Sequence, residues 1–377
     1  MFLKKIKHIL KLKYPSLVNK LIYFRDTSLL FRIFNNFKKI HPNKEIHGKK
    51  ITNIKNVDLK KNIFISKTFR PIFSSDVYPE IKFDNNSDDC SIILQGSITN
   101  YENFVIETIK IYSKIFKNSL IILSTWEDEI NNDFLLKVKN VINLKILLNK
   151  KIKTNFNVNL QIISTSSALE YAKKQKYKFS LKTRTDCRIY NPYALIFLKL
   201  LLKTFEVKNS NFIKNRILSG SIDTRIFRVY GLSDICLFGE TNDLAKYFLD
   251  EKYEESLLKM GMDIKSPIIN DVACISEIFL CARYLFNINQ NLDWTLDDWW
   301  IKCKNLFCVF DSKSIDFFWF KYHWQYEQRF LNNYTSKYNH SLQFYDWINI
   351  YNDNTELYDQ SNKEQWHLVD GIIKQKN

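Results

Sequence analysis

The sequence predicts an α/β fold, in which a mostly parallel β-sheet is flanked by helices. From about residue 90, short apolar runs alternate with longer segments whose apolar residues recur at helical spacing. Several of these runs end in polar clusters, as strands do where a sheet edge holds a ligand. Hydrophobic residues make up 45% of the 377 residues, which is enough for a large core and excludes a disordered chain.

Residues 1–88 are predicted to form a basic lead-in with a short strand at 62–66, and the polar cluster DNNSDD at 84–89 marks its end. Residues 1–70 contain 18 Lys and Arg but only three acidic residues, whereas the other 307 contain 38 basic and 37 acidic residues. A nucleic-acid-binding fold usually spreads its charge along a groove or face. Charge concentrated at one end favours a segment that lies on an anionic surface.

The first 13 residues have the pattern of a basic amphipathic helix, with apolar residues at 2, 3, 6, 9 and 10 and lysines between them. This helix is either a peripheral membrane anchor or a solvated helix packed on the domain. The segment lacks the apolar core and the cleavage site of a signal peptide, and no stretch reaches the ~18 apolar residues of a membrane span. We therefore expect a cytoplasmic protein.

Residues 89–290 are predicted to form the main domain. Its expected strands are 91–97, 119–127, 142–148 and 177–186, and its expected helices are 100–116, 128–139, 157–175, 192–205, 241–249 and 271–286, with one or two further strands within 225–240. Strands that alternate with helices imply parallel pairing, and ligands collect beyond the carboxyl ends of such strands. Residues 291–377 are aromatic-rich and expected to be mostly helical, with their rings packed in the core of the preceding domain.

The seven cysteines form no C-x-x-C pair, and most lie in apolar stretches, so we expect buried, reduced thiols. The six histidines do not cluster with them, which argues against zinc.

A polar run follows the apolar segment at 177–180. Lys182, Arg184, Asp186 and Arg188 alternate along it, and in an extended chain they would point to one face. Such a face suits a phosphorylated ligand, although a surface ion-pair ladder at a strand end is the alternative. The sequence has no P-loop, dinucleotide-binding, nucleophile-elbow or zincin motif. A phosphate would therefore be held by side chains or by a metal ion.

The segments ILQGSI (93–98), KIFKNSLIILSTWEDE (114–129), NLQIISTSSALEYAKKQKYKFSLKTRTDCRI (159–189) and LSDICLFG (232–239) resemble the WavE lipopolysaccharide-synthesis family. The resemblance spans roughly residues 90–290. It implies a GT-A-like fold and a glycosyltransferase that moves a sugar from a nucleotide-sugar donor to a lipopolysaccharide, lipooligosaccharide or capsule acceptor. The implied acceptor is a lipid-linked glycan. The enzyme would then be peripheral to the inner membrane, with its basic N-terminus on the anionic cytoplasmic surface.

The resemblance also implies a site at the strand ends. The residues that it assigns to nucleotide binding are Gln95, Gly96, Thr125, Glu127 and Gln161. Arg184, Thr185 and Asp186 occupy the place of the D-x-D motif of GT-A enzymes, with Arg184 in place of the first Asp, so that Asp186 would ligate Mg²⁺ or Mn²⁺.

Sugar transfer releases a diphosphate, whose developing negative charge must be stabilised by a divalent metal or by fixed cations. The fixed cations would be Lys182, Arg184 and Arg188, with Asp186 orienting an arginine or a ribose hydroxyl instead of binding metal. An inverting transferase also needs a base to take the proton of the acceptor hydroxyl, for which Asp234 and Glu277 are the candidates. The structural alternatives are a turn cap and a solvent-facing position on a helix.

Two other functions stay open. The same sheet would suit the transfer of another phosphorylated group to a surface glycan. A basic nucleic-acid-binding module is disfavoured, because it would place cations and aromatic rings together in the body of the fold, which is neutral. We therefore expect no nucleic-acid partner.

Overall fold

A computed structural model describes residues 87–99, 101–154, 157–207, 213–260, 275–321 and 341–358, and the strands at 366–369 and 372–375. The chain divides into two units, Met1–Ile72 and Phe73–Asn377, and all described residues belong to the second. The amphipathic helix expected within residues 2–13 and the strand expected at 62–66 lie outside the described residues. The domain boundaries at 88 and 290 stay predictions.

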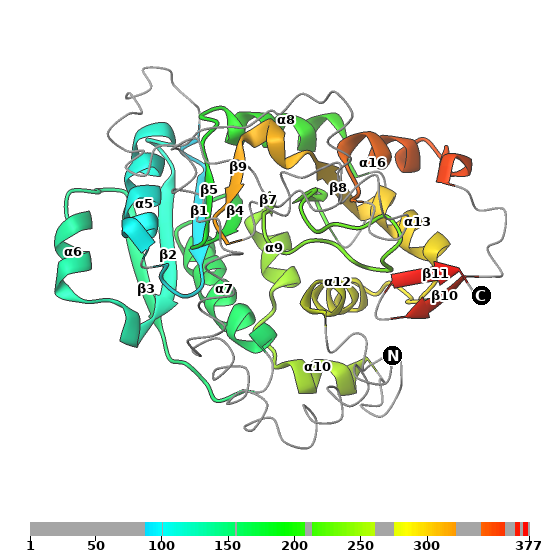
Figure 1. Cartoon of the computed structure of the whole chain (residues 1–377), viewed down its shortest axis with the longest axis horizontal. Helices are drawn as coiled ribbons and strands as arrows, with labels where there is room; N and C mark the ends of the chain where they lie inside the picture. Colours follow the sequence, from blue (N-terminus) through cyan, green and yellow to red (C-terminus); the bar gives the residue numbers. More distant parts are fainter. Residues whose placement is uncertain are drawn as a thin grey trace, which may run out of the picture. The chain divides into compact units, whose positions relative to one another are not determined.

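A seven-stranded sheet forms the centre of the described part (Figure 1). Its strands lie in the order β3 (Leu144–Asn149), β2 (Leu120–Trp126), β1 (Cys90–Gln95), β4 (Phe179–Arg184), β7 (Leu237–Glu240), β6 (Ile217–Gly220) and β8 (Phe307–Phe310). β7 is antiparallel to both of its neighbours, and the other pairs are parallel. This arrangement confirms the predicted α/β fold with a mostly parallel sheet.

The central strands form because their side chains are apolar on both faces, as parallel strands covered by helices require. Neighbouring residues such as Ile92 and Ile93 on β1, and Ile121 and Ile122 on β2, are all fully buried. The helix α7 (Asn157–Lys174) packs across β1, β2, β3 and β4, while α5 (Phe104–Ile115) packs on β2 (Figure 1). The core therefore extends across both sides of the sheet.

Four of the remaining helices correspond to predicted ones: α6 (Asn132–Val138), α8 (Ala194–Thr204), α9 (Thr241–Tyr247) and α12 (Ser276–Asn287). α10 (Tyr253–Lys259) was not predicted. α9 packs on β7 and β4, and α12 packs on α9. Each helix in the described part of the chain is either too short or too polar to span a lipid bilayer. The predicted buried thiols are confirmed for six cysteines: Cys90, Cys187, Cys236, Cys281, Cys303 and Cys308.

The aromatic C-terminal region contributes strands as well as helices. α13 (Leu296–Leu306) leads directly into β8, which completes the edge of the central sheet, and α16 (Phe344–Tyr351) packs on both. β9 (Phe317–Trp319) pairs with the short strand β5 (Cys187–Ile189), and β10 (Trp366–Val369) pairs with β11 (Ile372–Gln375). The helical prediction missed β8 and β9 because strands of three or four apolar residues are too short to show a period.

Six of the seven strands run in one direction, so their carboxyl ends meet at one edge of the sheet. β7 is reversed and begins at that edge, which places the segment before Leu237 beside the ends of β4 and β6. The backbone N–H of Gly220, the last residue of β6, donates to the oxygen of Cys236 at 3.0 Å. In open α/β sheets, ligands bind at this edge.

Candidate functional site

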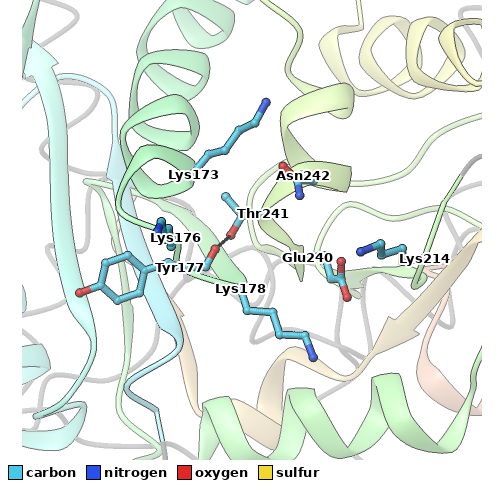
Figure 2. Close-up of a pocket in the computed structure, with 8 residues that line it drawn as sticks. All are labelled: Lys173, Lys176, Tyr177, Lys178, Lys214, Glu240, Thr241 and Asn242. Carbon is cyan, nitrogen blue, oxygen red and sulfur yellow. Dashed lines mark hydrogen bonds between the residues drawn. The ribbon is translucent and has the colours of Figure 1, made fainter.

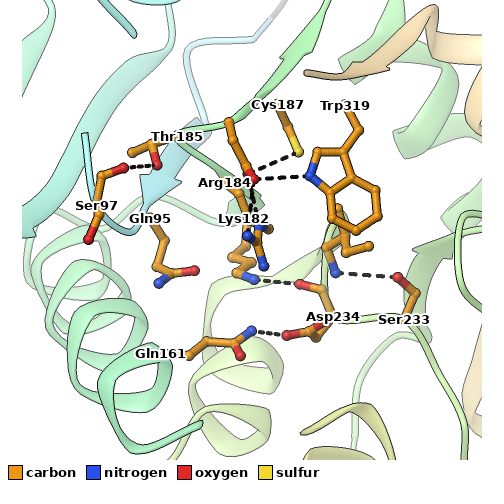
Figure 3. Close-up of polar contacts among 12 residues, drawn as sticks. Gln95, Ser97, Gln161, Lys182, Arg184, Thr185, Cys187, Ser233, Asp234 and Trp319 are labelled. Carbon is orange, nitrogen blue, oxygen red and sulfur yellow. Dashed lines mark hydrogen bonds and ion pairs between the residues drawn. The ribbon is translucent and has the colours of Figure 1, made fainter. Parts of the chain in front are cut away.

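The end of β4 carries two cations on the face of the sheet where α7 lies. Arg184 is in register with Gln95 of β1, and the Gln95 Nε2 atom donates to Ser164 Oγ of α7 at 3.0 Å. Residues in register on parallel strands share a face, and residues two apart on one strand also do. Lys182 and Arg184 therefore extend from the same face of the sheet as Gln95, and Figure 3 shows Lys182 reaching the backbone oxygen of Asp234.

Asp186 lies just beyond β4 and is held by three neighbours. Arg184 donates from Nε to Oδ1 at 2.9 Å and from Nη2 to Oδ2 at 3.1 Å. The indole Nε1 of Trp319, on β9, donates to Oδ2 at 3.0 Å, and the thiol of Cys187 lies 3.6 Å from Oδ1. Burial is the largest single influence and opposes ionisation, but the hydrogen bonds and the charge of Arg184, together with the hydrogen bonds from Trp319 and Cys187, outweigh it and keep the pKa of Asp186 below its ordinary value.

The expectation that four alternating side chains share one face is wrong for Arg188. The chain turns at Thr185 and Asp186, so the alternation of β4 does not continue into β5. Arg188 is buried against α5, where Nη2 donates to the oxygen of Phe104 at 2.8 Å and Nε donates to Thr108 Oγ1 at 2.9 Å. The structure thus separates Arg188 from Lys182 and Arg184 and gives it a packing role.

Lys182 is fully buried, and its amino group donates to the backbone oxygen of Asp234. The Nζ atom also lies 5.2 Å from the ring centroid of Phe248. Burial lowers the pKa of Lys182 to about 8, and the nearby Asp234 charge limits that decrease. The ammonium is therefore mostly protonated at neutral pH and loses its proton as pH rises through 8.

Asp234 lies in the segment that leads into β7, and its side chain is buried. Its Oδ2 atom accepts a hydrogen bond from Nε2 of Gln161, on α7 (Figure 3). Gln161, which was expected to bind the nucleotide, thus fixes the orientation of the Asp234 carboxylate.

Glu277 stands in the first turn of α12 and is partly buried. Burial is the main cause that raises the pKa of Glu277 to about 8, and the charge of the neighbouring Asp234 is the second. The two carboxylates that the sequence suggested as bases, 43 residues apart in the chain, therefore lie close enough to interact. A carboxyl group that titrates near pH 8 is suited to accept a proton at physiological pH.

The loops that follow β1 and β2 lie at the same edge of the sheet as the end of β4. Gly96 follows β1 with a φ of 117°, a backbone conformation that residues other than glycine rarely adopt. After this turn, the backbone oxygen of Ser97 accepts a hydrogen bond from Thr185 Oγ1 at 2.5 Å. After β2, Thr125 donates from Oγ1 to Glu129 Oε2 at 3.0 Å, while Glu127 is exposed. Gly96 and Thr125 thus shape the loops of the edge, and Glu127 faces solvent there.

A comparison with known protein families shows which family this chain belongs to. A family model described as WavE lipopolysaccharide synthesis matches residues 90–298, which is more than half of the chain. The chain belongs to the WavE lipopolysaccharide synthesis family. The resemblance that the strand-end segments suggested is thereby confirmed, and membership indicates a role in lipopolysaccharide biosynthesis. No curated protein matches the chain.

The residues around Asp186 do not fit a divalent metal ion in this WavE-family chain. Each oxygen of Asp186 already accepts a hydrogen bond from Arg184, and the indole of Trp319 donates to one of them as well. The adjacent side chains of the site, Lys182 and Arg184, are cations. Within the described ranges, no group of three or more His, Cys, Asp or Glu side chains is arranged to hold a metal.

Sequence reasoning missed Trp319, which lies beyond the residues matched by the WavE family model. Its FFW context gave only the signal of a core aromatic, and nothing in the chain order links it to Asp186. It also missed Asp223 and Arg228, on the loop between β6 and β7, whose charges act on the Glu277 carboxyl group. Their only sequence signal was charge placed between predicted strands.

A cavity of about 310 Å³ opens at the opposite edge of the sheet, where Glu240 at the end of β7 is in register with Phe179 at the start of β4 (Figure 2). Its lining residues are mostly basic or polar: Lys173, Lys176, Tyr177, Lys178, Lys214, Glu240, Thr241 and Asn242. This cavity contains none of the predicted site residues.

Proposed function

We propose that this chain is a glycosyltransferase that moves a sugar from a nucleotide-sugar donor to a lipopolysaccharide, lipooligosaccharide or capsule acceptor. One observation carries the proposal. Two cations, Lys182 and Arg184, lie at the carboxyl edge of a mostly parallel sheet next to two interacting carboxylates, Asp234 and Glu277. The cations suit the leaving diphosphate, and the carboxylates suit the acceptor hydroxyl. The mostly parallel sheet also supports the GT-A-like fold that the family resemblance implies.

The cations stabilise the diphosphate as its charge develops. Asp186 holds one edge of the Arg184 guanidinium with two hydrogen bonds, and the Arg184 side chain is 32% exposed, so the opposite edge is left to meet phosphate oxygens. Lys182 adds a buried positive charge beneath it. This scheme assigns Asp186 a positioning role, and the phosphate charge is met by side chains where the D-x-D pattern would have used Mg²⁺ or Mn²⁺.

The carboxylates take the acceptor proton. We assign the base to Glu277, because it is partly exposed and titrates near pH 8, whereas Asp234 is already bonded by Gln161 and raises the Glu277 pKa. The acceptor hydroxyl gives its proton to Glu277, and its oxygen forms a bond to the anomeric carbon of the sugar. The bond between that carbon and the diphosphate breaks, and its electron pair leaves with the diphosphate.

The acceptor in this proposal is a lipid-linked glycan at the cytoplasmic face of the inner membrane. The basic residues 1–70, with a net charge of about +15, would lie on the anionic lipid surface. The enzyme would then act as a peripheral membrane protein, although that segment lies outside the described residues.

A donor screen tests the proposal. The full-length protein is heated with UDP-, GDP-, CMP- and dTDP-sugars, each with and without Mn²⁺, and the melting temperature is recorded. We expect one donor class to raise the melting temperature by several degrees, and the effect to be lost in the Arg184→Met variant. A melting temperature that no nucleotide sugar changes, together with a shift caused by another phosphorylated donor, would replace sugar transfer by transfer of that group.

A further inference from the structure

One carboxylate joins three loops at the carboxyl edge of the sheet. Glu129 ends the 3-10 helix η3 (Glu127–Glu129), which directly follows β2. Its Oε2 atom accepts from the backbone N–H of Ile98, in the loop after β1, at 2.7 Å, and from Thr125 Oγ1, on β2, at 3.0 Å. Its Oε1 atom accepts from Nζ of Lys151, in the segment after β3, at 3.0 Å. Glu129 therefore binds residues at the ends of three neighbouring strands.

This carboxylate is largely shielded from water. The side chain of Glu129 is 18% exposed, whereas that of the preceding Asp128, which also bonds Lys151, is 67% exposed. Hydrogen bonds to a charged group are stronger in a shielded place than at an open surface. Among the described residues, the N–H of Ile98 makes no other hydrogen bond, so the loop after β1 depends on Glu129 for this anchor.

The loop after β1 is bonded in turn to the turn after β4. The residue that precedes the anchored N–H is Ser97, and its backbone oxygen accepts from Thr185 Oγ1 at 2.5 Å (Figure 3). The backbone N–H of Thr185 donates to the oxygen of Gln95, at the end of β1, at 3.1 Å. Thr185 stands between Arg184 and Asp186. The chain at the end of β1 therefore fixes the turn that presents the Arg184 guanidinium.

We propose that Glu129 is a positioning residue for donor binding. It holds the loop after β1 in place, and through Ser97 and Thr185 that loop keeps Arg184 oriented toward the donor diphosphate. Binding groups need such support from neighbouring hydrogen bonds to stay in the productive geometry. This inference rests on the proposed function for the identity of the donor, whereas the contacts of Glu129 do not depend on it.

A positioning role needs the oxygen of this side chain but not its charge. In Glu129→Gln, one amide oxygen can still accept from both the Ile98 N–H and the Thr125 hydroxyl group. In Glu129→Leu, most of the volume is kept but no acceptor is left. A carboxylate that bound a metal ion or the substrate directly would lose its function in both variants, so the pair of variants separates the two roles.

Calorimetric binding of the nucleotide that the preferred donor releases tests the proposal on the full-length chain. Glu129→Leu should weaken binding by roughly tenfold or more, and Glu129→Gln should stay within about threefold of wild type. Asp128→Asn is the matched control, because Asp128 shares the contact with Lys151 but bonds neither Ile98 nor Thr125, and it should leave the affinity unchanged. Equal affinity of wild type and Glu129→Leu, or an equal loss in both Glu129 variants, would overturn the proposal.

Hydrogen exchange separates this inference from the proposed function. In Glu129→Leu, the amide of Thr185 should exchange several-fold faster than in wild type, while the buried amides of Ile92 and Ile93 keep their rates and show that the sheet is folded. Unchanged exchange at Thr185 would overturn the positioning role whatever the ligand is. If no nucleotide binds the wild type, the proposed function fails, and the exchange rate of Thr185 still decides whether Glu129 holds the turn of Arg184.

Discussion

The guanidinium of Arg184 donates two hydrogen bonds to the carboxylate of Asp186, at 2.9 and 3.1 Å. The two residues are separated by Thr185 alone, and the tight turn there lets the guanidinium fold back on the carboxylate. This paired hydrogen bond fixes the relative orientation of the two side chains at the end of β4. At the position of the D-x-D motif in this chain, the Asp186 carboxylate therefore binds the Arg184 guanidinium.

Metal removal provides the first prediction. Because both oxygens of Asp186 are engaged by Arg184, donor binding should not depend on a divalent ion. We expect the dissociation constant for the nucleotide that the preferred donor releases to change less than twofold when EDTA is added. A large loss of binding that Mn²⁺ restores would show that Asp186 releases Arg184 to ligate the metal.

The second prediction concerns the indole that supports this pair. Trp319→Phe removes the N–H that bonds to Asp186 at 3.0 Å but keeps an aromatic ring near the Arg184 guanidinium. A lost hydrogen bond to a charged group costs about 1.5–3 kcal/mol, so donor affinity should fall by roughly tenfold or more. Trp347→Phe is the matched control, since its indole bonds to Cys303 away from the site. Equal effects of the two variants on donor affinity would refute the supporting role.

The third prediction is the pH dependence of sugar transfer. The pKa of Glu277 is about 8, so the fraction of ionised base, and with it kcat/KM, should rise as pH approaches 8. Glu277→Gln should lower kcat by about 10²–10⁴-fold and remove this rising limb, while donor affinity stays nearly constant. If the limb persists in Glu277→Gln and disappears in Asp234→Asn, the base is Asp234.

The fourth prediction is a gain of stability in the same variant. The folded-state pKa of Glu277 is raised from 4.5 to about 8, so the folded chain binds this proton more tightly than the unfolded chain. The stabilising contribution is fully present below pH 4.5 and is lost as pH rises through 8. At pH 8, Glu277→Gln should therefore raise the free energy of unfolding, by roughly 1–3 kcal/mol because the side chain keeps some contact with water.

Chemical denaturation at pH 5 and pH 8 measures this effect. The difference between wild type and Glu277→Gln should be larger at pH 8 than at pH 5. A difference that is equal at both pH values would mean that Glu277 is ionised throughout this range and that its surroundings do not raise its pKa.

Much of the sheet was predictable because its strands are long enough to leave a pattern. β1, β2 and β4 each have six or seven residues, and α7 has eighteen, so their periods are clear in the sequence. Their polar ends predicted the edge at which the candidate site lies. The end of β4 and the reversed strand β7 then brought the predicted residues Gln161, Lys182 and Asp234 into contact.

Other parts of the site depend on tertiary contacts that no local pattern encodes. The turn at Thr185 is fixed by its bond to Ser97, 88 residues away, and this turn is the reason that Arg188 leaves the face of Arg184. Trp319 reaches Asp186 only because β9 pairs with β5.

The most direct test of the account is calorimetric binding of UDP, GDP, CMP and dTDP to the wild-type chain and to Arg184→Met, with Lys178→Met, in the cavity at the opposite edge of the sheet, as the control. The account predicts that one of these nucleotides binds the wild type, that Arg184→Met weakens its binding at least tenfold, and that Lys178→Met leaves it unchanged. Equal affinity of wild type and Arg184→Met for that nucleotide would contradict the proposal that the end of β4 holds the donor phosphates.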